Sequence, residues 1–364
     1  MYRPSAKECA VILNQNAKKV SDRLRHSAEE IAPRIALYTS RTKEEAYQYV
    51  KEILDNGYRR IISGGGDGTL FHLISMAKRY LEEKNVQFQR MEQSVKKGLS
   101  TYSLPEFGVL KLGTGNSLAT LSGVGNGLMP LKSLAHGMDF GTFSVNLIEA
   151  EQRCFTFSGM GWDAAILNDY LWLKNKTVPL LSRFIQSLGG YLTAMFIRTI
   201  PSVVLRRKKV EVVVTNEGDC AYKVTPDGER IPLSQKPGDV LYDGPCNVAA
   251  VATTPFYGYH LKAFPFAMTL PGYMQVRIVK AGVAELLANA HPIWRGTYRS
   301  PNFIDFLAER VRFSFSERMP LQIGGDPEGY RHEITFSVSD LSVDLIDFRN
   351  PLPPPLYSQD TPLS

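Results

Sequence analysis

The sequence contains little cysteine, and its cysteines form no cluster. Four occur in 364 residues, namely Cys9, Cys154, Cys220 and Cys246, and none lies in a Cys-x-x-Cys motif or beside a pair of histidines. Zinc sites and disulfide frameworks both need cysteines at short, regular spacings. The pattern therefore argues against both and fits a reducing cytoplasm.

Long hydrophobic runs are also missing. The most apolar stretch, residues 178–201, is uncharged only over residues 184–197, whereas a membrane-spanning helix needs about 20 residues. Residues 1–7 are polar and lack the apolar core of a signal peptide. We expect a cytoplasmic protein whose only membrane contact is peripheral, at the inner face.

The basic residues lack the aromatic neighbours that a single-strand nucleic-acid binder uses. The net charge is +6, and part of it lies in the run Arg206-Arg207-Lys208-Lys209. Without interleaved aromatics for base stacking, we set nucleic acid aside as a partner. The run is then either a solvated strand end or a contact with anionic lipid headgroups.

Short apolar runs alternate with helical patterns through residues 1–141. The predicted strands are 9–13, 34–38, 60–62 and 107–112, and the helical patterns are 20–31, 46–54 and 70–80. This alternation predicts a three-layer α/β domain with a parallel sheet. We expect the polar insertion at 82–104 to be a surface loop with helical pieces.

The pattern changes after residue 141. Short strands with turn signals such as Asn-Glu-Gly-Asp at 216–219 predict a β-sandwich-like second domain over residues 142–345. Helical patterning there is confined mainly to residues 164–199. Residues 346–364 are rich in proline, and we expect an extended tail.

A glycine-rich loop, Gly64-Gly65-Gly66-Asp67-Gly68-Thr69, joins a predicted strand to a predicted helix. Glycines let backbone N–H groups approach a phosphate, and the helix dipole favours its negative charge. The alternative is a turn that only packs strand against helix. Asp67 favours the functional interpretation, because a carboxylate there suits a metal, a ribose hydroxyl or a proton to be removed.

Four predicted loops meet at one edge of the sheet. Asn14, Ser40, residues 64–69 and residues 113–116 all follow predicted parallel strands. Ligands of such sheets bind beyond the carboxyl ends of the strands. Agreement among four separate loops predicts a ligand site at this edge.

With these motifs in order, the chain resembles the diacylglycerol kinase catalytic-domain family, which includes bacterial lipid kinases and the sphingosine and ceramide kinases. That family shares its nucleotide-binding architecture with NAD kinases and phosphofructokinases. The resemblance covers about residues 8–345. Residues 159–164, Gly-Met-Gly-Trp-Asp-Ala, favour the lipid-kinase branch, where a Gly-aromatic-Asp-Ala segment begins a helical insertion.

The resemblance implies a site for ATP and Mg²⁺. The residues implied in contact with the nucleotide are Asn14, Ser40, Gly65, Gly66, Asp67, Gly68, Thr69, Gly113, Thr114, Gly115 and Asn116. Asp67 would also lie near the metal. Arg183 would point toward the phosphates, with an ordinary surface charge on a helix as the alternative.

The family's general base is the glutamate of an Asp-Gly-Glu turn, and the matching residues here are Gly324, Gly325 and Asp326. Asp326 or Asp67 would accept the proton of the acceptor hydroxyl, with Glu328 as a fallback. Asp326 could instead only cap a hairpin. Another departure follows the glycine loop, where Phe71-His72 replace the family's Asn-Glu. A second, structural metal is not expected, since residues 271–274 lack the family's aspartate.

The resemblance implies a kinase that phosphorylates a hydroxyl of diacylglycerol or a sphingoid-type lipid at the membrane surface. Residues 172–198 would face the lipid. The sequence is compatible with a homodimer and does not decide the oligomeric state. One alternative is an NAD kinase that uses Asn216-Glu217 for its dinucleotide. The other is a non-catalytic member that binds nucleotide or lipid, as the altered turn at Asp326 would permit.

Overall fold

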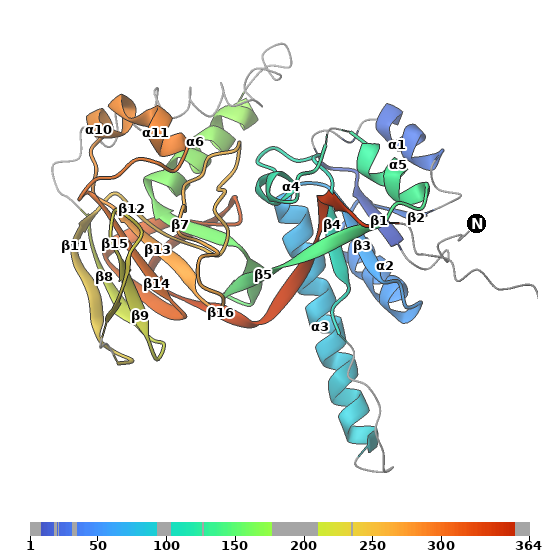
Figure 1. Ribbon diagram of the computed structural model, residues 1–364, viewed down its shortest axis with the longest axis horizontal. Helices are drawn as coiled ribbons and strands as arrows, with labels where there is room; N and C mark the ends of the chain where they lie inside the picture. Colours follow the sequence, from blue (N-terminus) through green and yellow to red (C-terminus); the bar gives the residue numbers. More distant parts are fainter. Residues whose placement is uncertain are drawn as a thin grey trace, which may run out of the picture.

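The structure is a computed structural model, and it describes residues 9–17, 20, 22–30, 35–92, 103–125, 127–176, 210–233 and 236–353. Two regions lie side by side, an α/β domain and a β-rich domain, and two long strands run between them (Figure 1). The predicted fold class is confirmed. Among the described residues, no helix is long and apolar enough to cross a membrane.

The α/β domain is built around a largely parallel sheet with the order β2-β1-β3-β4-β16. Its strands are β1 (Cys9–Asn14), β2 (Ala36–Ser40), β3 (Arg60–Gly64), β4 (Glu106–Val109) and the last part of β16 (Asp326–Pro351). Its helices are α1 (Asp22–Glu29), α2 (Lys43–Asp55), α3 (Asp67–Glu92), α4 (Ser117–Leu121) and α5 (Met129–Ala135).

Alternating side chains of β1 explain the three layers. Ala10 and Ile12 are buried on one face with residues of α2 and α3. Val11 and Leu13 are buried on the other face with residues of α1 and α5. Successive side chains of a strand point to opposite faces, so a strand apolar at every position is covered on both sides.

The second domain consists mainly of antiparallel strands. They are β5 (Phe140–Ala150), β6 (Arg153–Phe155), β7 (Phe157–Gly161), β8 (Val210–Asn216), β9 (Ala221–Val224), β10 (Arg230–Leu233), β11 (Val240–Cys246), β12 (Val248–Ala252), β13 (Met274–Val279), β14 (Phe303–Ala308), β15 (Arg310–Ile323) and the first part of β16. Helices α6 (Trp162–Lys176), α10 (Val283–Ala288) and α11 (Ala290–Trp294) lie together at one end of it (Figure 1).

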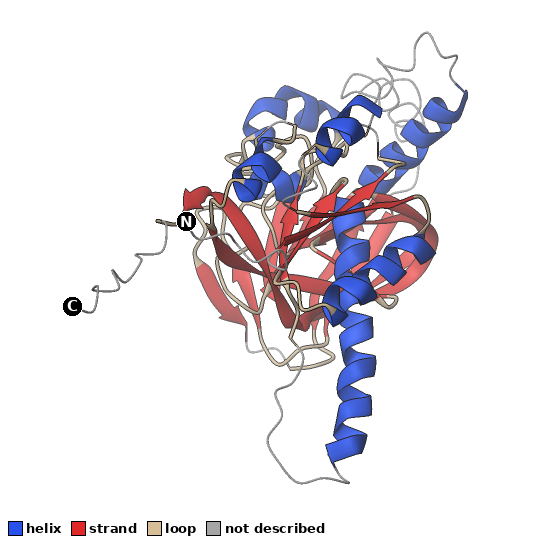
Figure 2. Ribbon diagram, turned by 90° about the vertical axis from the view of Figure 1, so that its right-hand side faces the viewer, coloured by secondary structure: helices blue, strands red, loops and turns tan. Residues whose placement is uncertain are grey.

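Helix α3 corrects the expected loop at 82–104, because it continues to Glu92 and extends well past the sheet (Figure 1, Figure 2). Polar side chains support the extension. Lys84 lies 3.0 Å from Asp55 of α2, and Arg79 pairs with Glu83 one turn further along α3. A polar helix of this kind lacks the apolar stripe that predicts helices from sequence, and contacts to another helix support it.

Strand β16 corrects the expected start of the tail. Residues 346–351 belong to this strand, and Leu345 pairs with Phe107 of β4. Ile346 has no exposed surface and packs in the cluster between the sheet and helices α1 and α5. The prolines that suggested a tail lie mostly beyond the strand, so the buried apolar residues before them decide the structure.

The buried position of Ile346 predicts a stability effect. Ile346→Ala should lower the free energy of unfolding by about 2–5 kcal/mol, because it leaves a cavity in the core of the α/β domain. Urea denaturation would measure the change. Leu352→Ala is the matched control: its side chain is 41% exposed, and its effect should stay within about 0.5 kcal/mol. Equal effects would mean that the segment does not pack as described.

Candidate active site

The predicted loops do meet at one edge of the sheet. Asn14 pairs with Ser40 at the ends of β1 and β2, and Leu13 pairs with Gly64 at the end of β3. Asn14 donates a hydrogen bond of 3.0 Å from Nδ2 to Thr69 Oγ1 in the first turn of α3. Parallel pairing thus brings three strand ends and the start of α3 together, as sequence reasoning predicted.

The glycine loop packs against the second loop backbone to backbone. A Cβ on Gly66 would lie 2.9 Å from Gly113 Cα, and a Cβ on Gly65 would collide with the Thr69 side chain. Neither position has room for a side chain. The glycines therefore serve the close packing of two loops, and they leave backbone at the edge where a ligand would bind.

Asp67 holds the two loops together. Its carboxylate, 6% exposed as a residue, accepts hydrogen bonds from the backbone N–H groups of Ser117 (2.7 Å) and Leu118 (3.0 Å) at the start of α4. Burial raises the pKa of Asp67, and the two N–H groups offset this only in part. Asp67 therefore links the glycine loop to the start of α4 by hydrogen bonds, in addition to any role toward a metal.

Asn116 shapes the second loop. It has the left-handed backbone conformation, with φ of 52°. Its side chain closes the loop by two reciprocal bonds, one from Gly113 N to Oδ1 (2.9 Å) and one from Nδ2 to Gly113 O (2.8 Å). Asparagine tolerates this conformation better than most residues because its side chain bonds the nearby backbone.

A segment of the second domain, residues 255–261, leans on the same loop, and we call it the strap. Tyr259 N donates to Gly115 O at 3.0 Å. The Cα of Gly258 lies 3.7 Å from where a Cβ on Gly115 would be. The edge of the first domain where the glycine loops meet is thus in direct contact with the second domain.

Asp326 also reaches the glycine loop from the second domain. It follows the two-residue turn of the β15–β16 hairpin, and its Oδ2 lies 3.2 Å from the position of a Cβ on Gly68. The side chain is 48% exposed, and Oδ2 is 3.6 Å from Arg153. Burial raises the pKa of Asp326, while the charges of Arg153 and Lys43 act in the opposite direction and offset it only in part.

Phe71 and Gly324, the two departures noted in the sequence, are in direct contact. The Phe71 ring packs edge-on against Phe157, with centroids 6.3 Å apart. A Cβ on Gly324 would lie 2.8 Å from Phe71 Cδ2. The large ring thus occupies the space that a side chain at position 324 would need.

His72 stands where the family has glutamate, and it is uncharged at neutral pH. Burial, then repulsion from Lys43 and Arg153, lowers the pKa of His72 to about 4. Arg153 also forms an ion pair with Glu328. Two positive charges, Lys43 and Arg153, and two carboxylates, Asp326 and Glu328, thus lie close together beside the glycine loop.

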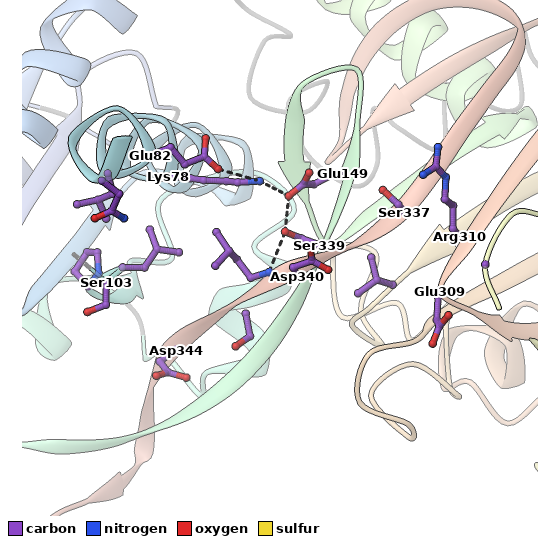
Figure 3. A pocket seen from close by; sticks show the side chains of 18 of the residues that line it. Lys78, Glu82, Ser103, Glu149, Glu309, Arg310, Ser337, Ser339, Asp340 and Asp344 are labelled. Carbon is purple, nitrogen blue, oxygen red and sulfur yellow. Dashed lines mark hydrogen bonds and ion pairs between the residues drawn. The ribbon is translucent and has the colours of Figure 1, made fainter. Parts of the chain in front are cut away.

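A large cavity lies elsewhere, and none of the predicted site residues lines it. It has a volume of about 950 Å³ and lies between α3, β5 and β16 (Figure 3). At its centre Lys78 pairs with Glu149, which also accepts a hydrogen bond from Ser339. Lys78 is eleven residues along α3 from Asp67, or roughly 16 Å at the helical rise.

The other predicted residues have different positions. Ser40 is buried, with its hydroxyl 3.5 Å from Leu13 O, whereas Thr114 is exposed. Arg183, most of the segment 172–198 and the run 206–209 lie outside the described residues. In the described part of the chain, no group of three His, Cys, Asp or Glu residues could hold a metal ion.

Sequence reasoning missed Lys43 and Arg153 as members of the site. Lys43 begins α2, and Arg153 lies on β6, far along the chain from Asp326. Neither residue belongs to a motif, and only the packing of β6 beside the β15–β16 hairpin brings Arg153 to the carboxylates. No local pattern could have found it.

Comparison with protein families identifies the first domain. Residues 8–141 match the model of the diacylglycerol kinase catalytic domain. The resemblance predicted from the glycine loops is therefore confirmed over this part of the chain. No curated protein sequence matches.

Two similar solved structures come from Bacillus anthracis str. Sterne. One, assigned as a diacylglycerol kinase, has a TM-score of 0.62 and 15% identity, covering 94% of this chain and 95% of that one. The other, a diacylglycerol kinase, has a TM-score of 0.60 and 14% identity, covering 94% and 97%. These likenesses show that the two-domain fold is shared along almost the whole chain.

The packing of Phe71 against the turn can be tested at two neighbouring glycines. Gly324 and Gly325 both have left-handed φ angles, 59° and 89°, but only a Cβ on Gly324 would meet Phe71. Gly325→Ala should cost about 1–2 kcal/mol for its backbone alone. Gly324→Ala should cost a further 1–3 kcal/mol, roughly, from overpacking.

The excess cost at Gly324 should shrink in a Phe71→Leu background, which a double-mutant cycle of unfolding free energies would measure. Equal costs at the two glycines, or an excess that Phe71→Leu leaves unchanged, would mean that the ring does not exclude a side chain from the turn.

Proposed function

We propose that this protein is a lipid kinase, which transfers the γ-phosphoryl group of ATP to a hydroxyl of diacylglycerol or of a sphingoid-type lipid. One observation carries the proposal: the carboxylate of Asp326 lies against Gly68, at the glycine loop of a domain that matches a kinase catalytic domain. A phosphate cradle and a candidate base thus meet across the two domains.

The residues at the loop edge fit the phosphates of ATP. Glycine backbone without room for side chains borders the start of α3, a 26-residue helix whose first N–H groups and dipole favour an anion. Lys43 and Arg153 add positive charge beside the loop. Phosphoryl transfer needs positioning and charge neutralisation more than covalent chemistry from the protein.

Mg²⁺ fits this site as a partner of the phosphates. Magnesium in kinases is commonly held by one or two carboxylates together with substrate phosphates, so no cage of three protein ligands is required. Asp67 is the carboxylate that would hold it. When bound, the ion would neutralise charge on the phosphates.

Asp326 is the better candidate for the base that takes the proton of the acceptor hydroxyl. Both oxygens of Asp67 already accept backbone N–H groups, and that side chain is buried. Asp326 is half-exposed at the domain junction, where an acceptor can arrive, and its raised pKa makes it a stronger base than an ordinary aspartate.

The acceptor is proposed to be a lipid presented at the inner face of a membrane. The alternative of an NAD kinase needs Asn216 and Glu217 to contact a dinucleotide. Asn216 is fully buried and bonds Gly218 in its own turn, and Glu217 pairs with Arg312 at 3.0 Å. These contacts give the pair a structural role and favour the lipid kinase.

The proposal is tested with purified protein, Mg²⁺ and γ-labelled ATP. Mixed micelles of diacylglycerol, ceramide and sphingosine are offered as acceptors, with NAD in a separate reaction. We expect label in a lipid. Label in NAD alone would establish the NAD kinase instead, and ATP binding without transfer would indicate the non-catalytic alternative.

The role of Asp326 predicts a specific kinetic loss. Asp326→Asn should lower kcat by roughly 10²–10⁴-fold, because the amide cannot accept the proton, while Glu328→Gln should change kcat by only a few-fold. Thermal melting of both variants checks that they fold. A larger decrease of kcat in Glu328→Gln than in Asp326→Asn would identify Glu328 as the base.

The pH dependence of kcat should carry the raised pKa of Asp326. The base acts only when deprotonated, so activity should fall on the acid side at a pH above about 3.9, the usual aspartate value. Arg153→Met removes a charge that lowers this pKa, so the acid limb should move to higher pH. A limb that moves to lower pH, or stays fixed, would show that another group titrates.

A further inference from the structure

A chain of buried side chains lies directly behind the Asp326 turn. Gln322, on β15 and 1% exposed, accepts a hydrogen bond of 2.8 Å at Oε1 from the backbone N–H of Gly325. Its Nε2 donates to the hydroxyl of Tyr257 in the strap. The N–H of Gly325 can only donate, which fixes the orientation of the Gln322 amide.

The chain continues to a carboxylate. The Tyr257 hydroxyl donates to Oδ2 of Asp163 at the start of α6, and Nε2 of Gln322 lies 3.5 Å from the same oxygen. A Cβ on Gly159 would collide with Asp163 Oδ2, so these groups are closely packed. Each member donates toward the carboxylate, an arrangement in which neighbouring hydrogen bonds strengthen one another.

The turn needs such support. Gly324 and Gly325 both adopt left-handed conformations, and glycine gives the backbone more freedom than any other residue. The hydrogen bond from Gly325 to Gln322 ties the turn immediately before Asp326. Gly324 N also donates to Phe157 O of β7 at 2.9 Å, so both glycine N–H groups of the turn are bonded, and the one next to Asp326 depends on Gln322.

The same chain reaches the nucleotide edge. Tyr257 precedes Gly258, which packs on Gly115, and Tyr259 bonds Gly115 O. One short strap therefore contacts the second glycine loop on one side and the Gln322 side chain on the other. Tyr257 thus links the second glycine loop to the side chain behind the Asp326 turn.

We propose that Gln322 and Tyr257 are positioning residues, which set the Asp326 carboxylate against the glycine loop and join its position to that of the 113–116 loop. This inference rests on the proposed function, since Asp326 is the proposed base. Neither residue would touch the reacting atoms, and both would act through the Gly325 backbone and the strap.

The second domain offers a matched comparison. Gln275 of β13 is also fully buried, accepts a backbone N–H at Oε1 (from Phe266, 2.8 Å) and donates from Nε2 to a carboxylate (Asp305, 2.7 Å). Its contacts involve no residue of the candidate site. Loss of Gln275 therefore removes similar hydrogen bonds without disturbing the Asp326 turn.

The kinetic test compares Gln322→Met and Tyr257→Phe with Gln275→Met in the full-length protein. The first two should lower kcat roughly 10- to 100-fold with little change in the KM for ATP or lipid, as expected for a displaced catalytic group. Gln275→Met should leave kcat unchanged.

A second measurement does not depend on activity. Amide exchange of Gly325 can be followed by NMR after ¹⁵N-glycine labelling, with the signal assigned by its loss in Gly325→Ala. Exchange should become roughly five- to tenfold faster in Gln322→Met and stay unchanged in Gln275→Met.

The two measurements separate the failures. If the wild type transfers no phosphate but Gly325 exchange responds as expected, the proposed function fails and the support of the turn stands. If exchange does not respond, or if Gln275→Met lowers kcat as much as Gln322→Met, the positioning role is overturned.

Discussion

The site depends on one strand, β16, which runs through both domains. Its first residue, Asp326, lies at the glycine loop, and its later residue Ile346 is buried in the core of the α/β domain. Between them the strand pairs with β15, β5 and β4. The strand pairs in both domains, so it connects the candidate base to the sheet that carries the glycine loops.

Three side chains that line the cavity in Figure 3 strengthen the connection between the two domains. Lys78 of α3 pairs with Glu149 of β5, and Ser339 of β16 donates to the same carboxylate. The helix that begins at the glycine loop is therefore attached to both strands that connect the domains. Partly buried charges are costly unless paired, and here their pairing joins three elements.

The site itself is assembled from backbone packed against backbone. Gly66 and Gly113 lie too close for a side chain at either position, Gly258 packs on Gly115, and the buried carboxylate of Asp67 joins the two loops of the first domain. Phe71 takes the room that a side chain at position 324 would need, so the Gly324 turn packs closely on the start of α3.

Local patterns determined much of this protein. The alternation of apolar runs and helical spacing predicted the α/β domain. The residues that directly follow its strands, such as Asn14 and Asn116, predicted the edge where the loops meet. Parallel pairing makes that edge a consequence of chain order, which is why sequence reasoning succeeded there. The glycines and Asp67 were recognisable because few other residues suit a turn of this kind between strand and helix.

Only the tertiary structure decided the rest. Helix α3 continues to Glu92, and Lys84 in its extension contacts Asp55 of α2, a partner that its own polar sequence does not reveal. Residues 346–351 belong to β16, and Ile346 is buried between the sheet and helices α1 and α5. Arg153 and Gln322 reach the Asp326 turn by the packing of strands distant in sequence. Local propensity acts over a few residues, whereas the partners of a buried charge or amide are set by which strands meet.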